Sequence, residues 1–224
     1  TIEYVIDQVK KSKLADSIIL CTTNLPEDDL LCEIATKNDI LFFRGSEKDK
    51  LDRWHKACME NDVDFFVTAD GDDLFCSYEL MDSAFQQNKS DPCDFIYGDG
   101  VVCGSFTYGI NAEALKKVCQ IKNTDDTEMM WVYFMNTGLF NTSVLKNVPS
   151  VYKRSDVRMT LDYQDDFNFF SEVINKIKVE NFNTSDVLSF LDENKNLIDI
   201  NFYLENQWRN NQISKTKLIL KEGK

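Results

Sequence analysis

The sequence lacks the short motifs by which several large enzyme classes are recognised. It contains no GxGxxG loop, no phosphate loop with a Walker lysine and no GxSxG elbow. Its single histidine, His55, gives poor support to a Ser-His-Asp triad or a histidine-based metal site, and no partner for a cysteine nucleophile is evident. These absences disfavour dinucleotide-binding enzymes, P-loop nucleotidases and serine hydrolases.

Other features are scarce as well. Only 3 prolines and 8 glycines occur among 224 residues, which argues against disorder and low complexity. No apolar stretch approaches the roughly 20 residues needed to span a bilayer. The 7 cysteines include no CxxC pair, so we interpret them as reduced thiols rather than disulfides or zinc ligands. The expected location is therefore cytoplasmic.

The chain is strongly acidic and has enough apolar residues for a core. Its formal net charge of -13 argues against a nucleic-acid partner and against docking on anionic lipid. Hydrophobic residues make up 43% and charged residues 28%, as in a globular protein. The length suits one domain, or one domain with a small appendage.

Strand and helix patterns alternate in the first half of the chain. Apolar runs predict strands at residues 17–23, 40–43, 63–68 and 94–97, with helices between them and an amphipathic helix at 2–9. This spacing suits right-handed parallel βαβ units. Later, residues 157–161 predict another strand, 163–178 a helix, and the last ~40 residues a helical appendage.

Carboxylates follow two of the predicted strands. Asp70, Asp72 and Asp73 surround Gly71 after the strand at 63–68, and Asp162 directly follows the strand at 157–161. Ligands bind beyond the carboxyl ends of strands in open α/β sheets, and Mg²⁺ prefers oxygen ligands and substrate phosphates. The alternatives are a solvated turn at 70–73 and a helix cap at Asp162.

Two further segments are candidates for binding. Arg44 and Ser46 flank a glycine after the strand at 40–43, and Arg53 follows on the next helix, where an arginine could clamp phosphate. The segment 126–128, which ends in Glu128, could hold a polar acceptor. An ordinary loop and a capping sequence remain the alternatives.

Taken together, these segments resemble the cytidylyltransferase family, which includes SpsF-like spore coat polysaccharide proteins, CMP-Kdo synthetases and acylneuraminate cytidylyltransferases. The resemblance covers nearly the whole chain, and its segments are 17–29, 43–53, 68–75, 158–166 and 190–194. It implies a three-layer Rossmann-like nucleotidyltransferase fold of the glycosyltransferase A type, with a mostly parallel sheet. The expected core is 1–180, and the expected C-terminal helical appendage is 181–224.

The resemblance also implies an activity and a site. The activity is Mg²⁺-dependent transfer of CMP from CTP to a sugar acid or phosphorylated small molecule, with release of pyrophosphate, for surface polysaccharide or glycan biosynthesis. The expected partners are CTP or another nucleoside triphosphate and a small acceptor, without nucleic acid or membrane insertion, and a homodimer is left open. The expected metal ligands are Asp72 and Asp162, and the expected catalytic residues are these two aspartates and Arg53. The residues expected to bind the nucleotide are Thr22, Arg44, Ser46, Arg53 and Gly71. Those expected to bind the acceptor are Tyr108, Glu128 and Arg158.

The chain departs from the family pattern in three places. The family begins with a strand and a basic, glycine-rich loop that grips the triphosphate, and residues 1–16 resemble only the helix after it, so N-terminal truncation is expected. Asp73 and Leu74 replace a small residue and a proline, and residues 126–129 lack the histidine of the related family segment. Two other functions remain open: a glycosyltransferase using Asp70 and Asp72 as an Asp-x-Asp motif, and an inactive nucleotide-binding domain.

Overall fold

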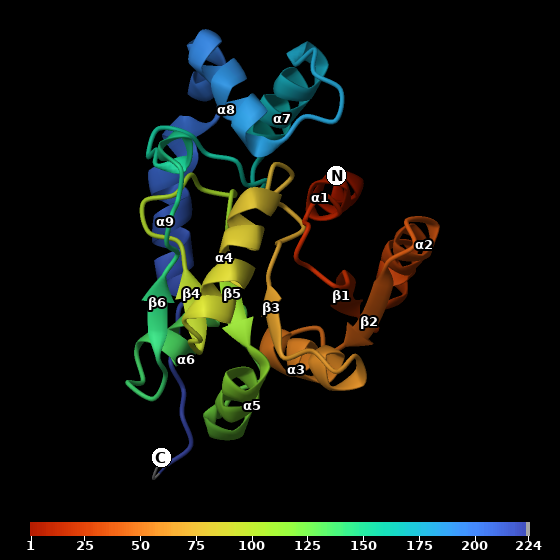
Figure 1. Ribbon diagram of the computed structural model, residues 1–224, viewed down its shortest axis with the longest axis vertical. Helices are drawn as coiled ribbons and strands as arrows, with labels where there is room; N and C mark the ends of the chain where they lie inside the picture. The colour runs from red at the N-terminus through yellow and green to blue at the C-terminus, as the bar shows by residue number, and fades with distance from the viewer. Residues whose placement is uncertain (223–224) are drawn as a thin grey trace.

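The computed structural model describes residues 1–222, and its helices and strands alternate through much of the chain (Figure 1). The strands are β1 (Ile19–Thr23), β2 (Leu41–Gly45), β3 (Phe65–Val67), β4 (Phe95–Tyr97), β5 (Tyr108–Asn111) and β6 (Thr142–Val144). The α-helices are α1 (Ile2–Val9), α2 (Asp29–Lys37), α3 (Lys50–Glu60), α4 (Tyr78–Ser90), α5 (Ala112–Ile121), α6 (Trp131–Met135), α7 (Gln164–Lys176), α8 (Thr184–Glu193) and α9 (Glu205–Lys215). Short 3-10 helices cover Pro26–Asp28, Ser150–Tyr152, Lys195–Ile200 and Phe202–Leu204.

The strands form two sheets of different character. β1 and β2 pair in parallel, whereas the second sheet has the order β3-β5-β4-β6. In that sheet β5 runs antiparallel to both β3 and β4, and only β4 and β6 are parallel. The predicted predominance of parallel pairing is therefore wrong. The reason lies in the loop 98–107, which returns the chain after β4 without a crossover helix, so β5 can only run antiparallel.

Helices cover both faces of the larger sheet, which gives three layers. Adjacent side chains of a strand point to opposite faces, and β4 shows this directly. Ile96 packs in one core cluster with Leu80 of α4, whereas Phe95 belongs to another cluster with Leu115 of α5 and Phe134 of α6. The Phe95 and Phe134 rings stack with their centroids 4.6 Å apart. The predicted three-layer α/β nucleotidyltransferase fold is confirmed.

The C-terminal helices pack on the core. Val187 and Leu191 of α8 share a cluster with Phe75 and with Phe170 of α7, and all four side chains are buried. Figure 1 shows α7 and α8 together at one end of the molecule, while α9 returns along the larger sheet. The boundary between a core at 1–180 and an appendage at 181–224 stays a prediction, and its last two residues lie outside the described part of the chain.

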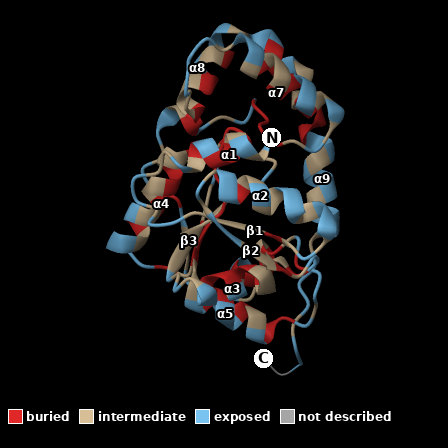
Figure 2. Cartoon of the chain, turned by 90° about the vertical axis from the view of Figure 1, so that its right-hand side faces the viewer, coloured by how far each residue is buried: buried red, intermediate tan, exposed pale blue. Residues whose placement is uncertain are grey.

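Burial follows this layering. Figure 2 shows buried residues gathered on the inner sides of α3, α4 and α8, while α2 and α9 are mostly intermediate or exposed. All seven cysteines are unpaired thiols. Among residues 1–222, no helix has the length and apolar character that crossing a membrane would require.

Candidate active site

A cavity of ≈ 1290 Å³ runs between the two sheets and reaches α9. Its walls include β1 and β3, the acidic turn 70–73, the loop 101–104, the segment 128–131 and one side of α9. Within the described chain, β1 pairs only with β2 and β3 only with β5, so each has one edge without a strand partner. The strand and glycine-rich loop expected before residue 1 stay a prediction.

The acidic turn directly follows β3. The backbone N–H of Asp73 donates to the carbonyl of Asp70 at 3.0 Å, which closes the turn around Gly71 and Asp72. Asp73 is buried, and Asp70 forms an ion pair with Lys50 of α3 at 2.9 Å. The predicted cluster of carboxylates at the end of this strand is therefore present, and one of its acids already has a basic partner.

Asp162 lies near this turn, but it does not follow a strand as expected. Residues 157–161 form no sheet strand, and only an isolated bridge joins Arg158 to Cys103, so the predicted strand is wrong. The segment is instead fastened to the acidic turn, because the N–H of Leu161 donates to the carbonyl of Asp72 at 3.0 Å. Asp72 and Asp162 both line the cavity. The two predicted metal ligands thus come from neighbouring segments.

A glycine in the loop 101–104 allows close packing of this loop against the acidic turn and the segment 157–162. Gly104 has a φ of +81°, and a Cβ atom there would lie 1.9 Å from the carbonyl oxygen of Met159 and 3.2 Å from Oδ1 of Asp73. Only glycine therefore lets the loop 101–104 pass between the segment 157–162 and the acidic turn.

Negative charge accumulates at this turn. Burial, then Asp70 and more weakly Asp162, raises the pKa of Asp72 to about 6. Burial and the neighbouring Asp72 hold the pKa of Asp73 well above its usual range. Carboxyl groups in this state favour a nearby cation. Among the described residues, no group of three or more His, Cys, Asp or Glu side chains is arranged to hold a metal ion. A cation here would need the two carboxylates and ligands from a substrate or water, which suits Mg²⁺.

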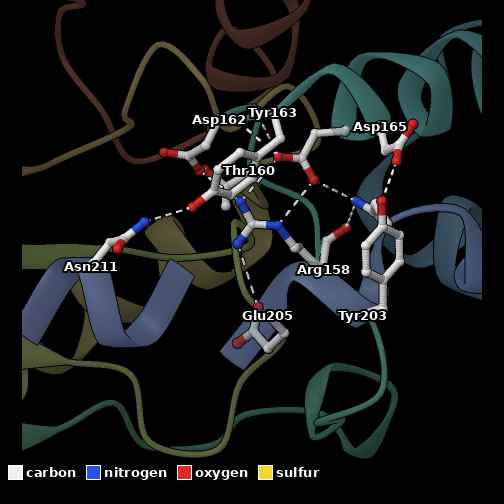
Figure 3. A network of polar contacts seen from close by, with 10 residues as sticks. Arg158, Thr160, Asp162, Tyr163, Asp165, Tyr203, Glu205 and Asn211 are labelled. Carbon is white, nitrogen blue, oxygen red and sulfur yellow. Dashed lines mark hydrogen bonds and ion pairs between the residues drawn. The ribbon is translucent and has the colours of Figure 1, made fainter. Parts of the chain in front are cut away.

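Arg158 lies completely buried behind Asp162 (Figure 3). Its Nη2 donates to Asp162 Oδ2 at 2.7 Å, and Nε and Nη2 donate to the two oxygens of Asp166 at 3.0 Å. Its Nη1 lies 3.5 Å from Glu205 of α9. The predicted direct contact of Arg158 with an acceptor is thus not possible in this arrangement. The arginine holds Asp162 in place instead.

The basic side of the cavity comes from α3. Asp49 begins this helix by accepting from the N–H of Asp52 at 3.0 Å, and Thr127 donates to the same carboxylate at 3.0 Å. Arg53 lines the cavity and donates to the carbonyl of Ser46 at 2.5 Å, yet its buried Nε has no hydrogen-bond partner in the described chain. A buried donor without a partner is costly and marks a place where a ligand could bind.

Three of the predicted nucleotide-binding residues lie beside the cavity without lining it. Arg44 holds the turn after β1, because it donates to the carbonyls of Thr23 at 2.8 Å and Leu25 at 2.7 Å. Ser46 accepts from a backbone N–H in the loop before α3, at 3.1 Å. Thr22 is buried within β1. These contacts position the walls of the cavity.

The remaining predicted residues do line the cavity. Gly71 faces it with room to spare, since a Cβ there would meet only Ile2 at 3.5 Å. Tyr108 of β5 lies with its ring centroid 4.9 Å from that of Phe95, and burial raises its pKa. Glu128 forms an ion pair with Lys215 of α9 at 3.1 Å. The structure therefore brings Arg53, Gly71, Tyr108 and Glu128 to the same cavity as the two aspartates.

The sequence-based selection missed Lys50 and the side chains of α9. Lys50 binds Asp70 and lies 4.9 Å from the ring centroid of Trp54. Its position one turn before Arg53 on the same helix was an available signal. No such signal in the sequence identifies the cavity-lining residues of α9, because only the fold brings this helix close to the acidic turn.

An α/β fold with carboxylates beyond the end of β3 and basic side chains in the same cavity suits the binding of a phosphorylated ligand. The profile described as "Cytidylyltransferase" matches residues 1–206. The chain belongs to the cytidylyltransferase family, and it is a nucleotidyltransferase.

Individual relatives agree with this assignment. The chain is 30% identical over 202 residues to uncharacterized protein MJ1063 of Methanocaldococcus jannaschii, covering 89% of this chain and 83% of that protein. It is 23% identical over 201 residues to spore coat polysaccharide biosynthesis protein SpsF of Bacillus subtilis, covering 86% and 83%. The solved structure of a cytidylyltransferase from Leptospira borgpetersenii superposes with a TM-score of 0.79 at 21% identity, over 88% of this chain and 84% of that one, and so shares the fold.

Proposed function

We propose that this protein transfers the cytidylyl group of CTP to a hydroxyl of a small acceptor, with release of pyrophosphate, and that Mg²⁺ is its cofactor. The bond between Leu161 N–H and the Asp72 carbonyl carries the proposal, because it brings Asp162 beside Asp72 in a cavity that also holds Arg53. Family membership supplies the reaction type.

The proposed reaction is an exchange of one bond for another. The acceptor oxygen forms a bond to the α-phosphorus of CTP, the bond from that phosphorus to the bridging oxygen breaks, and pyrophosphate leaves with the electron pair. The acceptor proton passes to water. Because phosphoryl transfer needs little covalent help from a protein, positioning and electrostatics supply most of the acceleration.

The residues divide these tasks between them. Asp72 and Asp162 would hold Mg²⁺, which when bound offsets the negative charge of phosphate oxygens. Arg53 and Lys50 line the cavity from α3 and add positive charge toward the phosphates. Arg158 keeps the Asp162 carboxylate oriented.

The acceptor we propose is a sugar acid or a phosphorylated small molecule, used to build a surface polysaccharide or glycan, as the name of the Bacillus relative suggests. Unpaired thiols throughout the chain favour a reducing compartment, so we place the reaction in the cytoplasm.

Pyrophosphate release tests the proposal. A panel of sugar acids and sugar phosphates is supplied with CTP and Mg²⁺, and UTP replaces CTP as a control. We expect Asp72→Asn and Asp162→Asn each to lower turnover by about 10²-fold or more, as the loss of a charge-stabilising group does. Mg²⁺ should raise the melting temperature of the wild type and not that of either variant. Turnover that persists in both variants would refute the proposed metal site at Asp72 and Asp162. Hydrolysis of a sugar nucleotide without release of pyrophosphate would instead indicate a glycosyltransferase.

A further inference from the structure

Helix α9 presents one tryptophan and three polar side chains to the cavity instead of an apolar stripe. Trp208, Gln212 and Lys215 follow the i, i+4, i+7 spacing of one helix face, and Arg209 adjoins them; all four line the cavity that holds Asp72. A helix that only covers a core buries an apolar face. On α9, Glu205 at the first position is the only buried residue. Packing alone therefore does not explain the inward face of this helix.

Polar contacts fix α9 against the acidic segments. The guanidinium of Arg158 lies 5.0 Å from the Trp208 ring centroid, and Asn211 donates to the Tyr163 hydroxyl at 2.9 Å (Figure 3). Arg158 also contacts Asp162 of the proposed metal site and Glu205 of α9. The orientation of α9 is thus tied to the position of Asp162.

Basic side chains from two helices line the cavity that holds the acids. On one side Lys50 of α3 pairs with Asp70 at 2.9 Å. On the other side α9 contributes Arg209 and Lys215, whose side chains are 61% and 53% exposed. Arg209 pairs with Glu205 and Lys215 pairs with Glu128, and each keeps further N–H donors. Since α3 carries the groups proposed for the phosphates of the nucleotide, these donors of α9 can bind a second anionic ligand.

Arg209 has donors to spare. Its Nε lies 2.7 Å from Glu205 Oε1, and no other ion-pair partner of this guanidinium occurs within residues 1–222. A planar guanidinium can still bind a carboxylate or phosphate through its remaining N–H groups. Lys215 lies six residues further on, about 9 Å along the helix axis.

We propose that α9 is the acceptor-binding wall of this enzyme, and that Arg209 binds a carboxylate or phosphate group of the acceptor. Trp208 lies beside this group as an apolar surface for the body of the acceptor, and Lys215 carries a second positive charge further along the wall. The acceptor hydroxyl then faces Asp72 and Asp162. This inference rests on the proposed function for the identity of the cavity, and it adds the residues that select the acceptor.

Binding without turnover tests the proposal first. Gluconate supplies a carboxylate, glucose 6-phosphate a phosphate and glucose a neutral counterpart, each titrated calorimetrically into the full chain. We expect one anionic probe to bind at least tenfold more tightly than glucose, and Arg209→Gln to weaken that binding by about tenfold or more. Arg209→Lys should retain part of it. Which probe binds distinguishes a carboxylate from a phosphate.

Matched controls separate this role from a general loss of charge. Lys217→Gln removes a cation just beyond α9 that does not line the cavity, and it should leave binding unchanged. All variants should stay folded at the assay temperature, because Arg209 and Lys217 are themselves exposed and the buried Glu205 keeps Arg158 as a second partner. If glucose binds as tightly as both anions, or Arg209→Gln binds like the wild type, the proposal is overturned.

Kinetics distinguish this proposal from the proposed function. With an acceptor that supports pyrophosphate release, Arg209→Gln should raise the acceptor KM at least tenfold and leave the KM for CTP unchanged. An unchanged acceptor KM would refute the role of α9 and leave the reaction standing. Loss of anion binding in the variant, without pyrophosphate release from the wild type, would refute the reaction and leave the subsite standing.

Discussion

The guanidinium of Arg158 donates to the carboxylate of Asp162 at 2.7 Å while lying completely out of contact with solvent. A charged side chain is costly to bury unless it is paired, and here Asp166 and Glu205 complete the pairing. This contact joins the core, the proposed metal site and α9. The C-terminal helix is therefore part of the architecture of the site.

Removing this arginine should unfold the protein more easily. Arg158→Met leaves Asp166 buried without its charged partner and leaves Glu205 paired only with Arg209, so we expect a loss of about 3–5 kcal/mol in the free energy of unfolding. Urea denaturation measures it. Lys37→Met is the control, because Lys37 and Glu3 form an exposed pair worth about 1 kcal/mol at most. A loss in Arg158→Met no larger than in the control would contradict a structural role for the buried pair.

The raised pKa of Asp72 predicts a pH-dependent cost of folding. Its folded pKa of about 6 lies above the usual value of 3.8, so the folded state binds the proton more tightly. The contribution of Asp72 to the free energy of unfolding is therefore largest below pH 3.8, and it falls as the pH rises from 3.8 to about 6.

Asp72→Asn removes this cost. Without Mg²⁺, the variant should gain melting temperature relative to the wild type between pH 4 and pH 6, and the difference should then level off. Scanning calorimetry across this range measures it, with the exposed Asp99→Asn as control. A constant difference between Asp72→Asn and the wild type from pH 4 to pH 7 would show that the pKa of Asp72 is not raised.

Two glycines with positive φ offer a matched test of the loop beneath the site. Gly100 has a φ of +65°, and a Cβ atom there would meet nothing within 4 Å, so Gly100→Ala should cost only the conformational strain of about 1 kcal/mol. Gly104→Ala adds a clash with the Met159 carbonyl oxygen at 1.9 Å.

We therefore expect Gly104→Ala to destabilise the protein more than Gly100→Ala and to lower turnover, because it displaces the segment that carries Asp162. Denaturation and the pyrophosphate assay measure the two effects. Equal stability and full activity in both variants would show that the loop is not tightly packed against that segment.

Local patterns predicted much of the fold. The early strands and the helices between them are confirmed within a few residues, because apolar runs and amphipathic spacing are local properties of the chain. The strand expected at 157–161 does not form, because strand pairing depends on a distant partner. Val157 and Met159 are buried, yet the neighbouring chain provides one bridge and a hydrogen bond to Asp72 instead of a continuous ladder. The antiparallel β5 also escaped prediction, since strand direction depends on how the 98–107 loop returns.

The sequence by itself determined the acids of the turn at 70–73, the arginine of α3 and the family, because each depends on which residues stand next to one another. Only the tertiary structure decided which groups meet. It placed Arg158 behind Asp162 instead of in the cavity, turned Arg44 of β2 toward the backbone of the turn after β1, and brought α9 to face Asp72 from more than 130 residues away. Such contacts arise when distant elements pack around one core, and no local spacing encodes them.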